Sequence, residues 1–252
     1  MILALIQARM GSTRLPGKVL KKINHQSILE NLMERVMPSK LVNQFVVVTS
    51  TNPEDDAIEE LCKAKGYACS RGSDWDVLDR FYQATINYNN VKTVVRLTSD
   101  CPLHSHKVVD FVVNEFLNSG KDYFSNSNNE PDFLEDGFDV EVFSYESLFT
   151  AWKEAKLLSE REHVTPFIKF SGQFKCGWKK SCADYTYKMS VDSPQDFEAV
   201  AAIFEALKNQ PDFGIEEVTA LLKSHPEILE KNKESIANSG FQKTIANDKI
   251  VK

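Results

Sequence analysis

Residues 2–18 read ILALIQARMGSTRLPGK, and this stretch decides the fold of the chain. Its first five residues are apolar without a break, which is typical of a strand buried on both faces of a parallel sheet. The loop that follows contains two glycines, one proline and three permanent positive charges, on Arg9, Arg14 and Lys18. Glycine lets the backbone approach a ligand, and these side chains supply hydrogen-bond donors. The composition therefore predicts a polyphosphate site at the end of a strand.

Two other interpretations of this loop can be tested on the sequence. A P-loop reads G-x-x-x-x-G-K-[ST]. Here five residues separate Gly11 from Gly17, and Val19 follows Lys18 where a Mg²⁺-binding hydroxyl would stand, so a P-loop ATPase is excluded. The second alternative is a basic surface loop that binds nothing. The end of a buried strand is where open α/β sheets bind ligands, which favours a site over that alternative.

The composition indicates one large α/β domain without a nucleic-acid or membrane partner. The chain has 252 residues, 42% of them hydrophobic, and a net charge of -6 with no long basic run. Its five scattered cysteines include no C-x-x-C pair, which disfavours a disulfide framework or a zinc site and predicts a reducing compartment. No basic stretch precedes Ile2 and no apolar run reaches membrane length, so we expect a cytoplasmic protein.

Strand and helix patterns alternate along the chain, which predicts a single Rossmann-like, mainly parallel sheet flanked by helices. We expect strands over residues 2–6, 45–48, 67–70, 93–97 and 137–143. We expect helices over residues 28–36, 54–65, 76–87, 106–117, 144–158, 194–207, 215–222 and 226–230. Strands over 174–178 and 185–191 are expected to pair antiparallel in a small second lobe. Residues 1–231 then form the domain, and residues 232–252 form a polar tail or a weakly docked segment.

Two loops at predicted strand ends concentrate polar side chains. The first, RGSDWDVLDR over residues 71–80, packs arginines and aspartates around a glycine. It is either a site that recognises a base and ribose or a capped helix start with solvated charges. The second places Asp100 just past a strand, with Pro102 fixing the turn, and Asp100 binds a ligand there or caps the next helix. Cys101 has no histidine partner fixed by spacing, so we expect a packed thiol.

Later segments add further acids. A polar loop over 127–136 is expected to be mobile, and the strand after it carries Asp139 and Glu141 on one face. Glu162 and His163 are adjacent and would diverge by about 100° on a helix, and no second histidine stands four residues away, which excludes zinc. His163 is either structural or an acceptor contact. Asp192 is not needed for the capped helix start that follows it and is left for another role.

These motifs resemble those of the CMP-Kdo and CMP-sialate synthetase superfamily, and most closely its SpsF-like cytidylyltransferase branch. The loop matches the signature A-R-x-x-S-x-R-L-P-G-K, Asp100-Cys101-Pro102 matches D-x-P, and Asp192 begins a match to V-D-[ST]-x-x-D. The R-G-S-x-x-D-V-L-x-R and R-E-H-V-T stretches are similar to those of the SpsF-like branch. The resemblance extends to about Phe197 and implies the nucleotide-diphospho-sugar transferase fold, with the antiparallel lobe serving the acceptor or dimerisation.

The resemblance also implies roles for individual residues. Catalysis is expected of Arg9, Arg14, Lys18, Asp100 and Asp192, and Mg²⁺ binding of the two aspartates. Nucleotide contacts are expected from Gln7, Ala8, Arg9, Gly11, Ser12, Arg14, Lys18, Arg71, Ser73, Asp76, Arg80 and Thr98. Acceptor contacts are expected from Asn126, Asp139, Glu141, Glu162 and His163.

The function that follows is transfer of CMP from CTP to a sugar acid or related acceptor, with release of pyrophosphate, for a surface or spore-coat polysaccharide. A glycosyltransferase that uses a sugar nucleotide is disfavoured, because its expected D-x-D motif lacks the second acid at Asp100-Cys101-Pro102. A non-catalytic nucleotide-binding protein is the third alternative. The superfamily also implies a homodimer. The attacking group of the acceptor stays open between a hydroxyl, a carboxylate and a phosphate.

Overall fold

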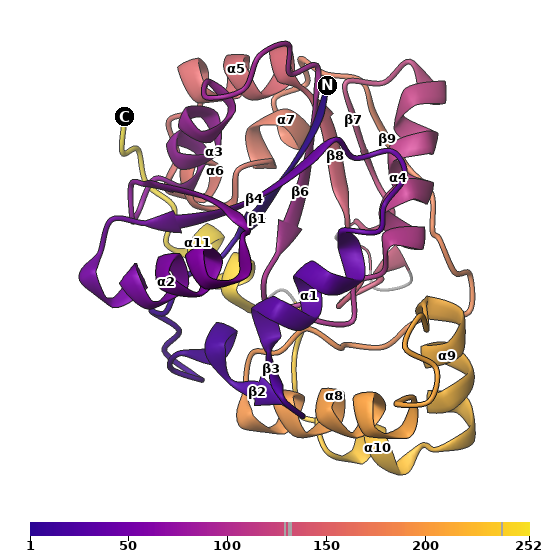
Figure 1. Ribbon diagram of the computed structural model, residues 1–252. Coiled ribbons are helices and arrows are strands. Elements are labelled where there is room, and N and C mark those ends of the chain that lie inside the picture. The colour runs from indigo at the N-terminus through magenta and orange to yellow at the C-terminus, as the bar shows by residue number, and fades with distance from the viewer. Residues whose placement is uncertain (129, 131–132, 238) are drawn as a thin grey trace.

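The computed structural model describes residues 1–128, 130, 133–237 and 239–252, and it places helices on both faces of a seven-stranded sheet (Figure 1). The strands are β1 (Ile2–Gln7), β2 (Lys22–Ile23), β3 (Gln26–Ser27), β4 (Gln44–Ser50), β5 (Ala68–Gly72), β6 (Thr93–Thr98), β7 (Tyr123–Ser125), β8 (Glu141–Ser144) and β9 (Cys176–Trp178). The α-helices are α1 (Ile28–Val36), α2 (Asp56–Lys65), α3 (Val77–Thr85), α4 (His106–Ser119), α5 (Tyr145–Glu154), α6 (Leu158–His163), α7 (Pro166–Phe170), α8 (Pro194–Ala206), α9 (Ile215–Ser224), α10 (Glu227–Glu230) and α11 (Ser239–Ala246). Short 3₁₀ helices are η1 (Lys18–Leu20) and η2 (Pro53–Asp55).

The sheet is built around β1, as its sequence predicts. Its order is β5-β4-β1-β6-β8-β7-β9, with β4 and β6 both parallel to β1 and with β8 antiparallel to β6 and β7. Leu3 to Ile6 are fully buried between these neighbours. The chain runs outward from β1 to β4 and β5 on one side and to β6 on the other, so the strand order reverses between β1 and β6. Ligands of open α/β sheets bind at the carboxyl ends of strands at such a reversal.

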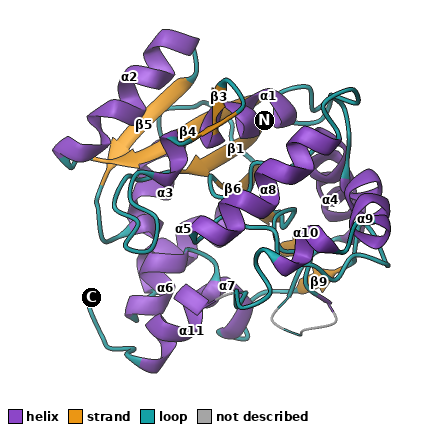
Figure 2. Cartoon of the chain, turned by 90° about the horizontal axis from the view of Figure 1, so that it is seen from below, coloured by secondary structure: helices purple, strands orange, loops and turns teal. Residues whose placement is uncertain are grey.

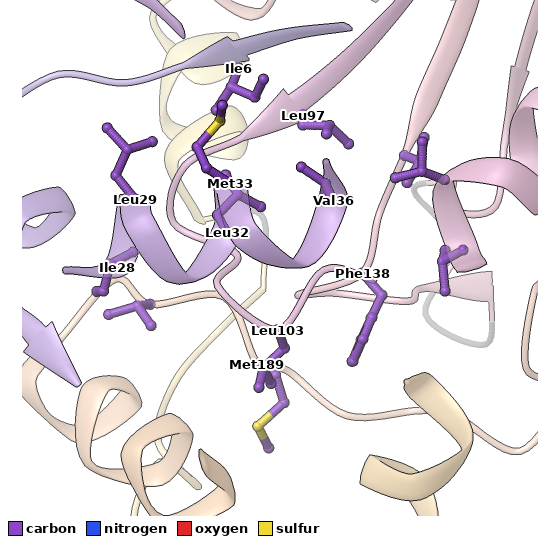
Figure 3. Close-up of a cluster of buried hydrophobic side chains, with 14 of the residues drawn as sticks. Ile6, Ile28, Leu29, Leu32, Met33, Val36, Leu97, Leu103, Phe138 and Met189 are labelled. Atoms are coloured by element: carbon purple, nitrogen blue, oxygen red, sulfur yellow. The ribbon is translucent and has the colours of Figure 1, made fainter. Parts of the chain in front are cut away.

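Alternation of side chains along each strand divides the core into one cluster on each face of the sheet. Ala4 and Ile6 point to the face covered by α1, α2 and α4, and Leu3 and Leu5 point to the face covered by α3, α5 and α7. Figure 3 shows Met33 of α1 facing the strand residue Ile6 on the first of these faces. The predicted α/β class is therefore confirmed, with helices on both sides of a largely parallel sheet.

Three predicted helix starts are confirmed by their caps. The Ser27 side chain accepts a hydrogen bond from the backbone N–H of Glu30, whose carboxylate accepts from the Ser27 N–H, and this completes a capping box before α1. Ser144 caps α5. Ser193 and Asp196 form a second capping box before α8, so the backbone of Asp192 is fixed by a helix that does not need its carboxylate.

The antiparallel pair predicted over 174–178 and 185–191 is wrong. Only β9 forms, and it pairs parallel with β7. Tyr185, Met189 and Val191 are buried, as the apolar pattern indicated, but their segment bonds to loops instead of a strand. The N–H groups of Met189 and Ser190 donate to the Asp136 carboxylate, and that of Val191 donates to the carbonyl of Asp100. The small antiparallel sheet of the fold is instead the β2–β3 hairpin.

Two other boundaries differ from the prediction. The strand expected from Gly137 begins only at Glu141, because Gly137 has a φ of 91°, and a Cβ at this position would lie 2.9 Å from the backbone of Met189. The helix expected over 144–158 ends at Glu154, and α6 begins separately at Leu158. The predicted polar loop includes residues 129, 131 and 132, which lie outside the described residues. Its described end is buried at Glu135 and Asp136.

The segment predicted as a polar tail contains a helix. α11 packs beside α6, and the residues after it continue along α6 (Figure 2). The Asp248 carboxylate accepts hydrogen bonds from the backbone and the hydroxyl of Ser159, at 2.9 and 2.6 Å. Ile250 forms a β-bridge with Leu157. A domain boundary at residue 231 stays a prediction. In the part of the chain that the structure describes, no helix has the length and apolarity needed to cross a membrane.

Candidate active site

A cavity of about 1040 Å³ opens at the carboxyl ends of β1 and β6, where the strand order reverses. We call it the site cavity. Most of the residues predicted for the site line it, although they come from six separate stretches of the chain. These residues are Gln7, Ala8, Arg9, Gly11, Ser12, Arg14, Lys18, Arg80, Thr98, Asp100, Asp139, Glu141, Glu162, His163 and Asp192.

The loop after β1 is fixed at both ends. The Met10 N–H donates to Asp55 Oδ1 at 2.7 Å, and the Gly17 N–H donates back to the Met10 carbonyl at 3.1 Å. Gly17 lies at φ 64°, in the left-handed region that glycine adopts at little steric cost, and η1 begins at the next residue. This turn directs Lys18 into the cavity, where 12% of its side chain is exposed.

Lys18 forms hydrogen bonds to both Asp100 and Asp192, which lie far apart in the sequence. Its Nζ lies 2.8 Å from Asp100 Oδ2 and 3.0 Å from Asp192 Oδ1, and it also donates to the Val191 carbonyl at 2.8 Å. Burial by itself lowers the pKa of Lys18, but the two carboxylates outweigh it and hold that pKa above its ordinary value. Burial likewise raises the pKa of Asp100, and Lys18 reverses this and holds it well below the usual range. Lys18 and Asp100 are therefore both charged at neutral pH.

Arg14 extends this cluster towards solvent. Its Nη2 is 3.2 Å from Asp192 Oδ1, while Nη1 donates to Ser239 Oγ of α11 at 2.9 Å. About half of its side chain (49%) is exposed, so the guanidinium can turn to a ligand without leaving a buried cavity behind. Arg9 is exposed and lines the same cavity.

The arrangement fits a divalent cation. Two carboxylates already enclose one compact positive group, the Lys18 ammonium, and hard cations such as Mg²⁺ take carboxylate oxygens, phosphate oxygens and water. Within residues 1–128, 130, 133–237 and 239–252, no three His, Cys, Asp or Glu side chains are grouped as a metal site. Asp100 and Asp192 thus form a partial ligand set that phosphate oxygens and water would complete.

Arg80 is buried without the partners that such a group requires. It is 2% exposed, and its Nε and Nη1 have no hydrogen-bond partner. Burial, and then the neighbouring positive charge of Arg9, lower its pKa to about 10. A buried guanidinium with two unused donors beside a second arginine favours an anionic or carbonyl ligand in the cavity.

A second charged cluster surrounds Glu141, which is 7% exposed. Its Oε1 accepts hydrogen bonds from Tyr123 Oη at 2.6 Å, Thr165 Oγ1 at 2.7 Å and Lys169 Nζ at 3.2 Å. Its Oε2 pairs with Arg96. Burial raises the pKa of Glu141, but Lys169 and then Arg96 reverse this and hold it well below the usual range, so the carboxylate stays ionised.

Asp139 differs in its electrostatics from the other acids of the cavity. Burial, and then the carboxylates of Asp136 and Asp100, raise its pKa to about 7. The neighbouring thiol of Cys101 is 1% exposed, and burial raises its pKa well above the ordinary value. Cys101 is therefore a packed thiol, as expected, and not a nucleophile.

Four predicted site residues have their side chains outside the cavity lining. Arg71 pairs with Asp56 and Glu59 on the surface. The Ser73 hydroxyl accepts from the Asp76 N–H, and Asp76 caps α3 and pairs with the buried Arg161. Asn126 is fully buried and bonds to Glu135, Phe138 and Val140. Of the two interpretations, the capped helix start is correct for residues 71–76, because their polar groups form hydrogen bonds and ion pairs within the fold.

Several residues of the cavity were not singled out from the sequence. One of them, Arg96, is detectable in principle as the one charged residue of strand TVVRLT. The others gave no local signal, because a helix that folds back from the chain end cannot be inferred from spacing. Among them are Lys169 of α7 and, in α11, Ser239, Gly240, Phe241, Lys243 and Thr244, with Asn247 just beyond it.

Comparisons with known proteins agree with the observed fold. A sequence model of the family described as cytidylyltransferase matches residues 3–237. An uncharacterized protein of Methanocaldococcus jannaschii is 44% identical over 167 residues, which make up 66% of this chain and 66% of that protein, just under two thirds of its length. Spore coat polysaccharide biosynthesis protein SpsF of Bacillus subtilis is 31% identical over 236 residues, covering 90% of this chain and 95% of that protein. The solved structure of a cytidylyltransferase from Leptospira borgpetersenii has a TM-score of 0.83 and 32% identity, covering 90% of this chain and 95% of that one.

Proposed function

The chain belongs to the cytidylyltransferase family, and from this premise we propose that it transfers CMP from CTP to a small-molecule acceptor and releases pyrophosphate. The observation that carries the proposal is the cluster of Lys18, Asp100 and Asp192 at the reversal of the sheet. A lysine and two carboxylates there provide both a phosphate contact and ligands for a divalent cation.

The loop after β1 supports a triphosphate site. Arg9, Arg14 and Lys18 offset negative charge on the phosphates, and the fixed backbone between Met10 and Gly17 lets them do so without reorganisation. When CTP binds, the guanidinium of Arg14 gives up its hydrogen bond to Ser239 and donates to a phosphate oxygen instead. Arg80, beside Arg9, supplies its unused donors to the nucleotide.

The proposed cofactor is Mg²⁺, held by Asp100 and Asp192. A bound Mg²⁺ ion supplies Lewis-acid stabilisation of phosphate oxygens during the displacement. The protein itself needs no nucleophile. It aligns an acceptor oxygen with the α-phosphorus of CTP, and the new P–O bond forms as the bond to pyrophosphate breaks.

The proposed acceptor lies towards Asp139, Glu141, Glu162 and His163. Asp139, with its pKa near 7, can take a proton from the attacking oxygen near neutral pH if that oxygen is a hydroxyl. By its similarity to the spore-coat protein, we place the product in the biosynthesis of a surface polysaccharide, with a sugar acid or related compound as acceptor.

Thermal unfolding with each of the four ribonucleoside triphosphates and Mg²⁺ tests the nucleotide assignment. A ligand that binds only the folded state stabilises it by about 2.7 kcal/mol at 100 times its Kd. We expect CTP to raise Tm more than ATP, GTP or UTP does. A rise with one of those three and none with CTP would contradict the assignment. Pyrophosphate release that requires both CTP and an acceptor then separates transfer from mere binding.

Substitution of Arg80 is expected to have opposite effects on stability and binding. Arg80→Met removes two unused donors from the interior and should stabilise the free protein by about 1–3 kcal/mol. It should weaken CTP binding by roughly 10- to 100-fold, because a hydrogen bond to a charged group is lost. Unfolding in urea and calorimetric titration measure the two effects.

The matched control is Gln83→Met, which lies on the same helix outside the cavity lining. It should leave CTP affinity unchanged. Arg80→Met protein that is destabilised yet binds CTP normally would remove Arg80 from the nucleotide site.

A further inference from the structure

The wall of the site cavity is completed by the helix at the end of the chain. α11 lies beside α6 (Figure 2). Its cavity-lining residues, with one just past its end, are Ser239, Gly240, Phe241, Lys243, Thr244 and Asn247. The match to the family model ends at residue 237, before α11 begins. The proposed nucleotide site thus lies within the matched segment, and α11 lies outside it.

Core packing does not account for the position of α11. None of its residues is buried. It is held by polar contacts at the cavity, with Thr244 Oγ1 donating to Glu162 Oε2 at 3.0 Å, and by the anchor between Asp248 and Ser159. A helix that buries no side chain of its own and covers one end of a cavity is placed to contact what the cavity contains.

The end of the cavity under α11 carries excess positive charge. Arg96 and Lys169 share the single buried carboxylate of Glu141, and Lys243 of α11 lines the same cavity. These three positive side chains face two carboxylates, Glu141 and Glu162, and Glu162 Oε2 lies 4.0 Å from His163 Nε2. The Nε2 atom of His163 is buried there without a hydrogen-bond partner. Burial, and then Arg96 and Lys169, lower the pKa of His163 to about 4, so its ring is neutral at pH 7.

Phe241 of α11 contacts both of these groups. Its ring meets the His163 ring edge-on with centroids 5.0 Å apart, and Lys169 Nζ lies 5.9 Å from the centroid of the same ring. An aromatic ring at this distance attracts an ammonium group and limits where it can lie. Phe241 is therefore a positioning residue for the two side chains.

We propose that α11 forms the outer wall of the acceptor subsite, and that an anionic group of the acceptor binds between Lys169 and the Nε2 of His163. Phe241 holds the two in place. The inference rests on the proposed function for the identity of the ligand as an acceptor. It assigns to that acceptor a carboxylate or a phosphate, and it makes α11 a determinant of acceptor specificity.

Nitrogen NMR of histidine-labelled protein tests the subsite directly. The chain has five histidines, and His163→Gln identifies the resonance of His163. The protein is saturated with Mg²⁺ and the α,β-methylene analogue of CTP, which fills the triphosphate site and cannot release pyrophosphate. Inorganic phosphate, D-glucuronate and neutral D-glucose are then titrated. We expect either anion to shift the His163 Nε2 resonance in a saturable way, and D-glucose to leave it unchanged.

The matched variants are Phe241→Ala and Ile245→Ala. Ile245 stands on the same helix, is 48% exposed and does not line the cavity. Phe241→Ala should weaken anion binding by about three- to tenfold, the change expected from losing an aromatic contact to a cation, and Ile245→Ala should not change it. Lys169→Gln should abolish the shift, and Lys169→Arg should restore it.

Three results would overturn the proposal: no response to either anion, an equal response to D-glucose, or wild-type affinity in Phe241→Ala. Failure of the proposed function gives a different result. In that case CTP does not raise Tm in the wild-type protein, whatever the anions do at His163.

Discussion

Asp100→Asn is expected to lower kcat by at least about 100-fold, since loss of one electrostatic contact to the transition state costs roughly 2.7–4 kcal/mol of barrier. The substitution removes one negative charge at constant shape. Asp100 Oδ2 then no longer pairs with Lys18, and the proposed Mg²⁺ ligand set loses one of its two carboxylates. The carbonyl of residue 100 still accepts from the Val191 N–H, so the local fold is kept.

Pyrophosphate release at several Mg²⁺ concentrations measures this effect. The variant should also need more Mg²⁺ for half-maximal rate, because an amide oxygen is a weaker ligand than a carboxylate. Asp184→Asn is the control, since this exposed acid pairs with Lys223 outside the cavity lining and should retain full activity. Normal turnover of Asp100→Asn with unchanged Mg²⁺ dependence would exclude Asp100 as a metal ligand.

Lys18→Met is expected to be at least as damaging to kcat/KM, again by about 100-fold or more. The ammonium group is lost from the phosphates, and Asp100 and Asp192 face each other without the cation that now separates them. Two carboxylates that share one site repel, so the pKa of one should rise from its present low value.

Steady-state kinetics and CTP titration separate the change in kcat from the change in CTP affinity. We expect both weaker CTP binding and a lower kcat, because Lys18 contacts phosphates in the ground state and in the transition state. Lys21→Met serves as control: Lys21 is exposed, lies one turn further along the chain and does not line the cavity. CTP affinity and kcat close to wild type in Lys18→Met would mean that the ammonium group serves only to hold the two acids.

These two positions could be found in the sequence because each has a local signature. Lys18 ends a loop of distinctive spacing, and Asp100 follows a buried strand before a proline. The same holds for the helix starts at Ser27 and Ser193, since a capping box is completed within four residues. Short-range interactions involve residues that are close together in the sequence, so they can be predicted from the sequence.

The sequence was less informative where a polar residue could serve either the site or the fold. Asp76 and Arg80 belong to one charged stretch, yet Asp76 pairs with the distant Arg161 and Arg80 faces the cavity. Tyr185, Met189 and Val191 are buried as expected, but the carboxylate of Asp136 accepts the N–H groups of Met189 and Ser190, and no strand forms. In each case the deciding partner lies far away along the chain.

By itself, the sequence determined the parallel sheet around β1, the cationic loop after it and the acids at the strand ends, because periodicity and spacing act locally. Tertiary structure alone decided that Asp192 lies 3.0 Å from Lys18 Nζ, that Glu141 is shared by Arg96 and Lys169, and that α11 lines the same cavity as the loop after β1. Such contacts depend on how distant segments fold back on the sheet. That is set by the packing of the whole core, which no single stretch of sequence contains.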